Sequence, residues 1–173
     1  MGTGLHRRGQ LGSVALLLIA AVVVLRPWEG IGQPGREPGS ARAYVVRAVD
    51  GDTIEARIGS ETEDVRYIGV DTPETVKPGT PVQCFGHRAS DFNHRLAEHR
   101  RARLVFGVER RDVYGRLLAY VYIDHRFVNA ELVRRGFART LAIAPNTRYQ
   151  GLFGRLERHA ARLGRGLWGA CGP

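Results

Sequence analysis

Three β-rich runs precede the first helical pattern of this chain, and this order restricts the fold more than any other feature of the sequence. Residues 43–49 and 53–58 are rich in β-branched side chains, and the sequence Asp-Gly-Asp at 50–52 separates them. An Asp-Gly pair between two such runs predicts a β-hairpin. A Gly-Ser turn at 59–60 then leads into a third predicted strand at 62–70.

Helical and strand patterns alternate in the second half of the chain. Large and small apolar residues recur at spacings of three and four, which predicts the first helix. Asn129 is the predicted N-cap of a second, short helix, and Gly136 is predicted to follow its last turn. The predicted helices are 84–99, 129–136 and 148–163, and the further strands are 102–108 and 116–123. Five strands and three helices favour a small, highly curved antiparallel β-barrel with peripheral helices, an α+β fold.

The N-terminus has a different composition from the rest. Arg7 and Arg8 precede an apolar run at 11–25, which has no polar face and therefore does not suit a buried core helix. We interpret residues 1–28 as a signal peptide or an N-terminal membrane anchor. Residues 29–42 are rich in glycine and proline and are predicted to form a flexible linker. The folded domain, 43–173, is then expected outside the cytoplasm, either secreted or membrane-anchored.

The chain has two cysteines, Cys84 and Cys171, so one intramolecular pairing is possible. Two free thiols are the alternative. In an exported domain we expect a disulfide between them. Closing a loop of this length stabilises a fold by roughly 4 kcal/mol in the chain-entropy model.

Charge is unevenly distributed along the chain. The net charge is +9, and almost all of the basic residues are arginine. Residues 50–74 are strongly acidic, whereas residues 75–173 are strongly basic. A basic surface attracts polyanions such as nucleic acid, and a generic basic surface on a soluble protein is an equally good explanation of the charge alone.

Two carboxylates, Asp52 and Asp71, stand at predicted strand ends and suit a hard cation. Calcium prefers oxygen ligands, including backbone carbonyls such as that of Thr72. No Cys/His grouping has the spacing of a zinc site, and we assign His94 and His99 to a solvated helix face. Taken singly, each acidic stretch is also explained as an ordinary turn.

Carboxylates that lie close together repel one another unless a positive charge lies between them. A cation or Arg66 could supply that charge. Arg66 and Asp71 differ by an odd number of positions, so a straight strand would place them on opposite faces. Their convergence requires a bend, which we expect after Val70, where Pro73 follows.

Three motifs in this order, "VDGDTI", "VRYIGVDTPE" and "VYGRLLAYVYIDHRFVNAELVRRGFAR", resemble the staphylococcal-type nucleases, also called thermonucleases. The resemblance extends over residues 44–168. It implies a five-stranded OB-fold barrel with three helices, a bound calcium ion, and cleavage of phosphodiester bonds in DNA and RNA. Position by position, it implies calcium ligands at Asp52, Asp71 and the carbonyl of Thr72. It also implies that Glu74 activates or positions the attacking water.

The same resemblance implies that Arg66 and Arg116 bind the scissile phosphate. Asp50 and Asp112 correspond to supporting acidic positions, and Tyr114 is retained. Two departures concern substrate binding. Val113 stands where the best-known member has a lysine, and the segment "ARTLAIAPN" has no aromatic residue where that member has tyrosines. Both changes predict a weaker grip on phosphate and base.

The sequence therefore favours a monomeric, calcium-dependent nuclease acting on DNA, RNA or both outside the cytoplasm, with a membrane as a partner if the leader is retained. One alternative is a non-catalytic OB-fold module that binds nucleic acid. Another is an extracytoplasmic structural or adhesion domain, for which the basic surface alone would suffice.

Overall fold

The structure of this protein is a computed structural model that describes residues 1, 39–75, 79 and 81–171. The predicted leader, apart from its first residue, and most of the predicted linker lie outside the described residues. Within the described part of the chain, no helix has the length and apolar character needed to cross a membrane.

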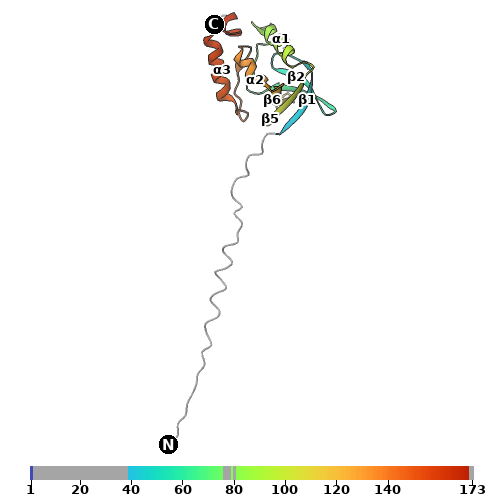
Figure 1. The fold of residues 1–173 in the computed structure, drawn as a ribbon, viewed down its shortest axis with the longest axis vertical. Helices are drawn as coiled ribbons and strands as arrows, with labels where there is room; N and C mark the ends of the chain where they lie inside the picture. Colours follow the sequence, from blue (N-terminus) through green and yellow to red (C-terminus); the bar gives the residue numbers. More distant parts are fainter. Residues whose placement is uncertain (2–38, 76–78, 80, 172–173) are drawn as a thin grey trace. The chain divides into compact units, whose positions relative to one another are not determined.

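Five strands close into a barrel (Figure 1). They are β1 (Ser40–Ala48), β2 (Thr53–Ile58), β3 (Glu61–Tyr67), β5 (Arg101–Arg111) and β6 (Leu117–Ile123). Their order is β3-β2-β1-β5-β6, and pairing of β3 with β6 closes the ring. The predicted OB-fold barrel is therefore confirmed.

The barrel is mixed rather than antiparallel, because β3 and β6 pair in parallel. The chain leaves β3, passes through a helix and β5, and returns along β6 in the direction of β3, which the sequence patterns do not specify. Three two-residue strands were also not predicted. They are β4 (Val70–Asp71), β7 (Arg126–Phe127) and β8 (Arg139–Thr140).

Helices lie around the barrel. The three predicted helices are present as α1 (Gly86–Ala97), α2 (Val128–Arg134) and α3 (Gln150–Arg162), and a further single turn forms α4 (Leu167–Ala170). Figure 1 shows α2 between α3 and the barrel, and α2 contacts both α3 and β6. Inward-facing side chains such as Val45, Ile54 and Leu104 are fully buried in the core. Each contributes about 1.5–3 kcal/mol of hydrophobic stabilisation.

The bend that brings Arg66 and Asp71 together lies before Val70, not after it. β3 ends at Tyr67, a turn at 68–69 follows, and β4 then pairs with β8. Gly69 adopts a φ of 81°, a left-handed conformation that favours glycine. A Cβ there would also lie 2.5 Å from the ring of Phe153 on α3. The packing of α3 against this turn was not visible in the local sequence, and the prediction therefore misplaced the bend.

Asn129 is not the N-cap of α2, because Phe127 occupies that position. Its side chain is buried and instead accepts a hydrogen bond from the Val121 amide and donates one to the Ile68 carbonyl, at 2.9 and 2.8 Å. It therefore ties α2 and β6 to the bend between β3 and β4. Gly136, with a φ of 74°, does follow the end of α2 as predicted.

Replacing Asn129 with alanine is expected to lower the free energy of unfolding by about 2–6 kcal/mol. The substitution leaves the Val121 amide and the Ile68 carbonyl buried without this partner, at about 1–3 kcal/mol each. Urea unfolding of the purified domain measures the loss. A change below about 0.5 kcal/mol, the size of an ordinary surface substitution, would show that Asn129 does not anchor the bend.

Candidate active site

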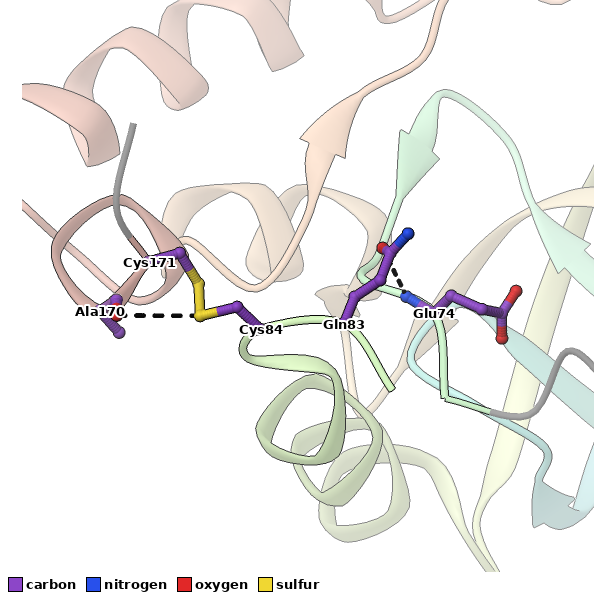
Figure 2. Close-up of a disulfide and its surroundings, with 5 residues drawn as sticks. All are labelled: Glu74, Gln83, Cys84, Ala170 and Cys171. Carbon is purple, nitrogen blue, oxygen red and sulfur yellow. Dashed lines mark hydrogen bonds between the residues drawn. A yellow bond between two sulfur atoms is a disulfide. The ribbon is translucent and has the colours of Figure 1, made fainter. Parts of the chain in front are cut away.

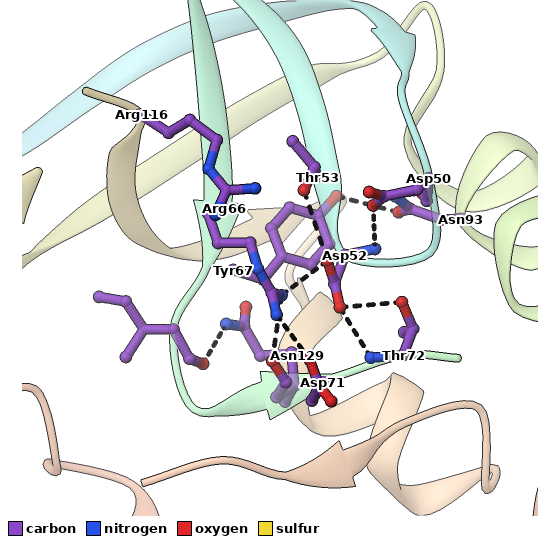
Figure 3. Close-up of polar contacts among 12 residues, drawn as sticks. Asp50, Asp52, Thr53, Arg66, Tyr67, Asp71, Thr72, Asn93, Arg116 and Asn129 are labelled. Carbon is purple, nitrogen blue, oxygen red and sulfur yellow. Dashed lines mark hydrogen bonds and ion pairs between the residues drawn. The ribbon is translucent and has the colours of Figure 1, made fainter. Parts of the chain in front are cut away.

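One guanidinium group connects Asp52 and Asp71, the two carboxylates at predicted strand ends (Figure 3). Arg66 Nη1 lies 2.6 Å from Asp52 Oδ1, and Arg66 Nη2 lies 2.9 Å from Asp71 Oδ1. Arg66 also donates a hydrogen bond of 3.1 Å to the carbonyl of Val70. The bend before β4 thus places Asp71 beside an arginine from the end of β3, and the expected convergence occurs.

Asp52 is held at the start of β2 by contacts on both of its carboxylate oxygens. Its Oδ2 atom accepts hydrogen bonds of 2.7 and 2.8 Å from the amide and the hydroxyl of Thr72. Gly51 permits this approach, since a Cβ there would lie 2.5 Å from Thr72 Oγ1. The hairpin turn and the segment after β4 are therefore joined through Asp52, although they are twenty residues apart in the chain.

A second set of contacts fixes the hairpin turn itself. The Asp52 amide donates to Asp50 Oδ1 at 2.9 Å, and the Asp50 carbonyl accepts from Asn93 Nδ2 at 2.8 Å. Asn93 is a buried residue of α1 and also accepts a hydrogen bond of 2.9 Å from the hydroxyl of Tyr67. Asp50 thus supports the turn. No sequence motif pointed to Asn93, whose role depends on how α1 packs.

Electrostatics at Asp52 favour an additional positive charge. Only 4% of this residue is exposed, and its burial raises the pKa of the carboxyl to about 7 even though Arg66 and Thr72 favour the ionised form. The nearby donors therefore do not fully compensate the buried charge. Asp52, Asp71 and the Thr72 carbonyl form an all-oxygen donor set, which fits calcium. Among the described residues, no group of three or more His, Cys, Asp or Glu side chains is arranged to hold a metal, so such a site relies on two carboxylates and a backbone oxygen.

Glu74 follows the turn after β4, and its main chain is held from the far side of a loop (Figure 2). The Glu74 amide donates to Gln83 Oε1 at 3.0 Å, and the Gln83 amide donates to the Glu74 carbonyl at 2.9 Å. The next residue, Cys84, forms the predicted disulfide with Cys171. Figure 2 shows the Glu74 carboxylate directed away from Gln83 and the disulfide. No pattern in the sequence indicated this contact of Gln83.

Arg116 precedes β6 and is held by Asp112 from the same turn. Its Nη2 atom lies 2.7 Å from Asp112 Oδ2, and its amide donates to Asp112 Oδ1 at 3.0 Å. The guanidinium carbon lies 5.4 Å from the centre of the Tyr114 ring, which is largely exposed. Asp112 therefore holds the Arg116 side chain in place.

These side chains line one cavity of about 430 Å³. Its lining comprises Asp50, Asp52, Arg66, Asp71, Thr72, Pro73, Glu74, Tyr114 and Arg116. All of the predicted catalytic and metal-binding residues are therefore brought together. Asp112 contacts Arg116 but does not line this cavity. Their individual roles stay predictions.

A more apolar cavity of about 310 Å³ adjoins this one and shares Arg66, Tyr114 and Arg116 with it. Val113, Leu141 and Ile143 contribute apolar side chains to its lining and are exposed. The segment without aromatic residues therefore still presents an apolar wall beside the candidate active site.

Comparison with known proteins gives a consistent result. Residues 64–170 match the family described as staphylococcal nuclease homologue. The thermonuclease of Staphylococcus hyicus is 35% identical over 88% of this chain and 94% of that protein. The thermonuclease of Staphylococcus intermedius is 38% identical over 90% of this chain and 95% of that protein. Endonuclease YncB of Bacillus subtilis is 43% identical over 73% of this chain and 61% of that protein.

Proposed function

This chain belongs to the staphylococcal nuclease family, and from that premise we propose that it is a calcium-dependent nuclease that hydrolyses phosphodiester bonds of DNA, RNA or both outside the cytoplasm. One observation carries the proposal. The guanidinium of Arg66 bridges Asp52 and Asp71 in a cavity that Glu74 and Arg116 also line. Metal-assisted phosphodiester hydrolysis uses oxygen ligands for a cation, cationic groups for the phosphate and a base for water, and side chains of all three kinds line this cavity.

Asp52, Asp71 and the Thr72 carbonyl would hold the calcium ion. A bound cation would offset the negative charge that builds on the phosphoryl oxygens during in-line attack. The raised pKa of Asp52 supports this assignment, because a cation beside a buried carboxylate favours its ionised form.

Arg66 and Arg116 would bind the phosphoryl oxygens of the scissile group. A guanidinium offers a planar fork of N–H donors that matches the geometry of phosphate. Arg66 lies against two carboxylates and Arg116 against Asp112, so each arginine is already oriented at the cavity. These oriented donors would stabilise charge that is larger in the transition state than in the substrate.

Glu74 would accept the proton of the attacking water, or position that water for attack. A carboxylate within reach of water is a suitable general base. The Glu74 main chain is held by Gln83, which precedes the disulfide-bonded Cys84. The Glu74 side chain therefore lines the cavity from an anchored segment. Asp50 and Asp112 act in support, the first through the hairpin turn and the second through Arg116.

We further propose that residues 1–28 direct export or anchor the protein, that residues 29–39 are a linker, and that the domain acts as a monomer. The predicted linker, 29–42, extended too far, because residues 40–42 pair with β5 as the start of β1. The presence of a disulfide supports an oxidising location, where such bonds persist. N-terminal sequencing of the mature protein tests the leader. An intact N-terminus on protein recovered in the cytoplasm would contradict export.

Digestion of DNA and RNA by the purified domain, with calcium or with an excess of chelator, tests the proposed activity. We expect cleavage with calcium and none with chelator. Binding of nucleic acid without cleavage under either condition would instead support a non-catalytic OB-fold module.

Calcium is expected to raise the melting temperature of the domain at pH 7.5, because it binds the folded protein and not the unfolded chain. At a hundred times its dissociation constant, a ligand adds about 2.7 kcal/mol. Asp71→Asn should abolish most of this shift by removing a ligand that lies largely at the surface. Asp91→Asn, an exposed acid on α1, is the matched control and should retain it. Equal shifts in both variants would place the ion elsewhere.

A further inference from the structure

A basic surface lies on the outside of the barrel, away from the cavity already described. The strand register places its side chains in two neighbouring rows. Tyr44 on β1 stands between Arg57 on β2 and Arg101 on β5. In the next row, the order across β1, β5 and β6 is Arg42, Arg103 and Tyr122. We call these six residues the Arg–Tyr face.

All six side chains point outward, because the residues between them in each strand are buried. Ala43 and Val45 flank Tyr44, and Ala102 separates the two arginines of β5; all three are buried in the core. The face lines a surface cavity of about 790 Å³ that also includes His125 and Asp124. Its exposed arginines therefore surround a concave surface that a ligand can enter.

The positive charge of this face lacks a compensating ion pair in the part of the chain that the structure describes. Within the described residues, none of its four arginines forms an ion pair with an acidic side chain. The acidic residue in the cavity lining, Asp124, pairs instead with Arg100 at 2.7 Å. An uncompensated cluster of guanidinium groups attracts a polyanion.

Aromatic rings alternate with these charges. The guanidinium carbon of Arg103 lies 4.2 Å from the centre of the Tyr122 ring, and that of Arg57 lies 5.4 Å from the Tyr44 ring. Surfaces that combine cationic groups for the backbone with flat groups on which bases stack are typical of proteins that bind single-stranded nucleic acid. A duplex hides the faces of its bases, so this combination favours single strands.

The Arg–Tyr face and the candidate active site lie at opposite ends of shared strands. Arg116 precedes β6 and Tyr122 is near its end, six positions on, which is about 20 Å at about 3.3 Å per residue. The two cavities share no lining residue. A single strand could therefore occupy both at once only if it were several nucleotides long.

We propose that the Arg–Tyr face is a second binding site for single-stranded nucleic acid, which holds a long substrate while one of its phosphates lies in the active site. Phosphates contact the four arginines. Bases stack on the Tyr44 ring and on the outer guanidinium plane of Arg103, because Tyr122 is itself covered by Arg103 on one side and by Phe127 on the other. This inference rests on the proposed function for the statement that the bound strand is also the substrate. It adds a site that acts through binding and takes no part in the chemistry.

The test compares the double variant Arg57→Gln/Arg103→Gln with Arg155→Gln/Arg158→Gln, which removes the same charge from exposed positions on α3. Fluorescence anisotropy in chelator measures binding of oligothymidylates of four and sixteen nucleotides without cleavage. The first variant should bind the 16-mer at least about tenfold more weakly at low salt, whereas the control should change less than about twofold. Each lost phosphate contact should also flatten the slope of log K against log salt by about 0.7.

Two further measurements separate this site from the active site. Hydrolysis of a single-nucleotide chromogenic phosphodiester with calcium should be unchanged in the Arg57→Gln/Arg103→Gln variant, because so small a substrate cannot reach the face. Tyr44→Leu keeps an apolar side chain but removes the stacking surface, so it should weaken 16-mer binding without altering the salt slope. If the double variant fails to fold in a thermal melt, Tyr44→Leu decides the question alone.

Equal weakening of 16-mer binding in both double variants would overturn the proposal, since only overall charge would then matter. An unchanged affinity in Tyr44→Leu would overturn it too. Selective loss of binding to anionic lipid vesicles or heparin, with 16-mer binding intact, would assign the face to a different polyanion. Absence of phosphodiester hydrolysis in the wild type, with 16-mer binding still dependent on the face, would contradict the proposed function and not this site.

Discussion

Arg66→Gln is expected to lower kcat/KM for DNA cleavage by about 10²–10³, the loss that follows removal of one preorganised donor to a developing oxyanion. Arg66 is placed between Asp52 and Asp71 at the cavity, and glutamine can neither carry its charge nor form a bidentate contact with phosphate. Initial rates over a range of DNA concentrations, with saturating calcium, measure the effect.

The same substitution should also destabilise the domain, because it leaves Asp52 buried without its cationic partner. Removing one member of a fully buried pair costs roughly 3–5 kcal/mol, and the 14% exposure of the Arg66 side chain places this case toward the lower end. Burial already raises the pKa of Asp52 to about 7, so the folded state favours the neutral carboxyl. Loss of Arg66 should raise this pKa further.

The pH dependence of the stability loss follows from this rise in the pKa of Asp52. In the folded domain burial favours the neutral carboxyl of Asp52 and Arg66 favours the ionised form, so the variant keeps Asp52 neutral up to a higher pH than the wild type does. The stability gap should therefore widen from pH 5.5 to pH 8.5, measured by urea unfolding in chelator. Arg47→Gln, which breaks the exposed pair with Glu55, is the control and should show activity and stability near wild type. A similar loss of activity and stability in both variants would show that Arg66 has no special role in the cavity.

Glu74→Gln is expected to reduce kcat by about 10²–10⁴, the usual contribution of a positioned general base. An amide keeps the size of the side chain and an oxygen for the contact with the Thr75 amide, but it cannot take a proton from water. Binding of DNA and the stabilisation by calcium should both be retained. Single-turnover cleavage, anisotropy and thermal melts on the same preparation measure the three quantities.

Glu61→Gln is the matched control for this variant, because Glu61 is an exposed acid at the start of β3 outside the cavity lining. Its cleavage rate should equal that of the wild type. A Glu74→Gln rate within about threefold of wild type would exclude Glu74 as the base and leave activation of water to another group.

Local sequence patterns predicted the barrel because its strands are short, alternating and separated by clear turns. The hairpin at 50–52 and the glycine that follows α2, Gly136, were both predicted because they depend on interactions over only a few residues. The bend at 68–69 did not, since it depends on Gly69 facing Phe153 from a helix more than eighty positions later. The prediction of Asn129 as an N-cap was wrong for the same reason, because its side chain binds distant backbone groups and does not cap its own helix.

Only part of the candidate site could likewise be predicted from the sequence. Asp52, Asp71 and Arg66 could be proposed from charge and position, although only the fold shows one guanidinium between two carboxylates. The role of Gln83 could not be predicted from neighbouring residues, because its side chain binds the Glu74 amide across a loop, nine positions away. The Arg–Tyr face was also invisible, since its rows exist only once strands distant in the sequence are in register.

The most direct test of a calcium-dependent site at Asp71 is the rate of cleavage of single-stranded DNA by the wild-type domain and by Asp71→Asn as free calcium is raised from chelated to millimolar levels. We expect a wild-type rate that is absent in chelator and saturates with calcium, and a curve for Asp71→Asn displaced to higher calcium. A wild-type rate that is the same with and without chelator, or superimposable curves for the two proteins, would contradict such a site.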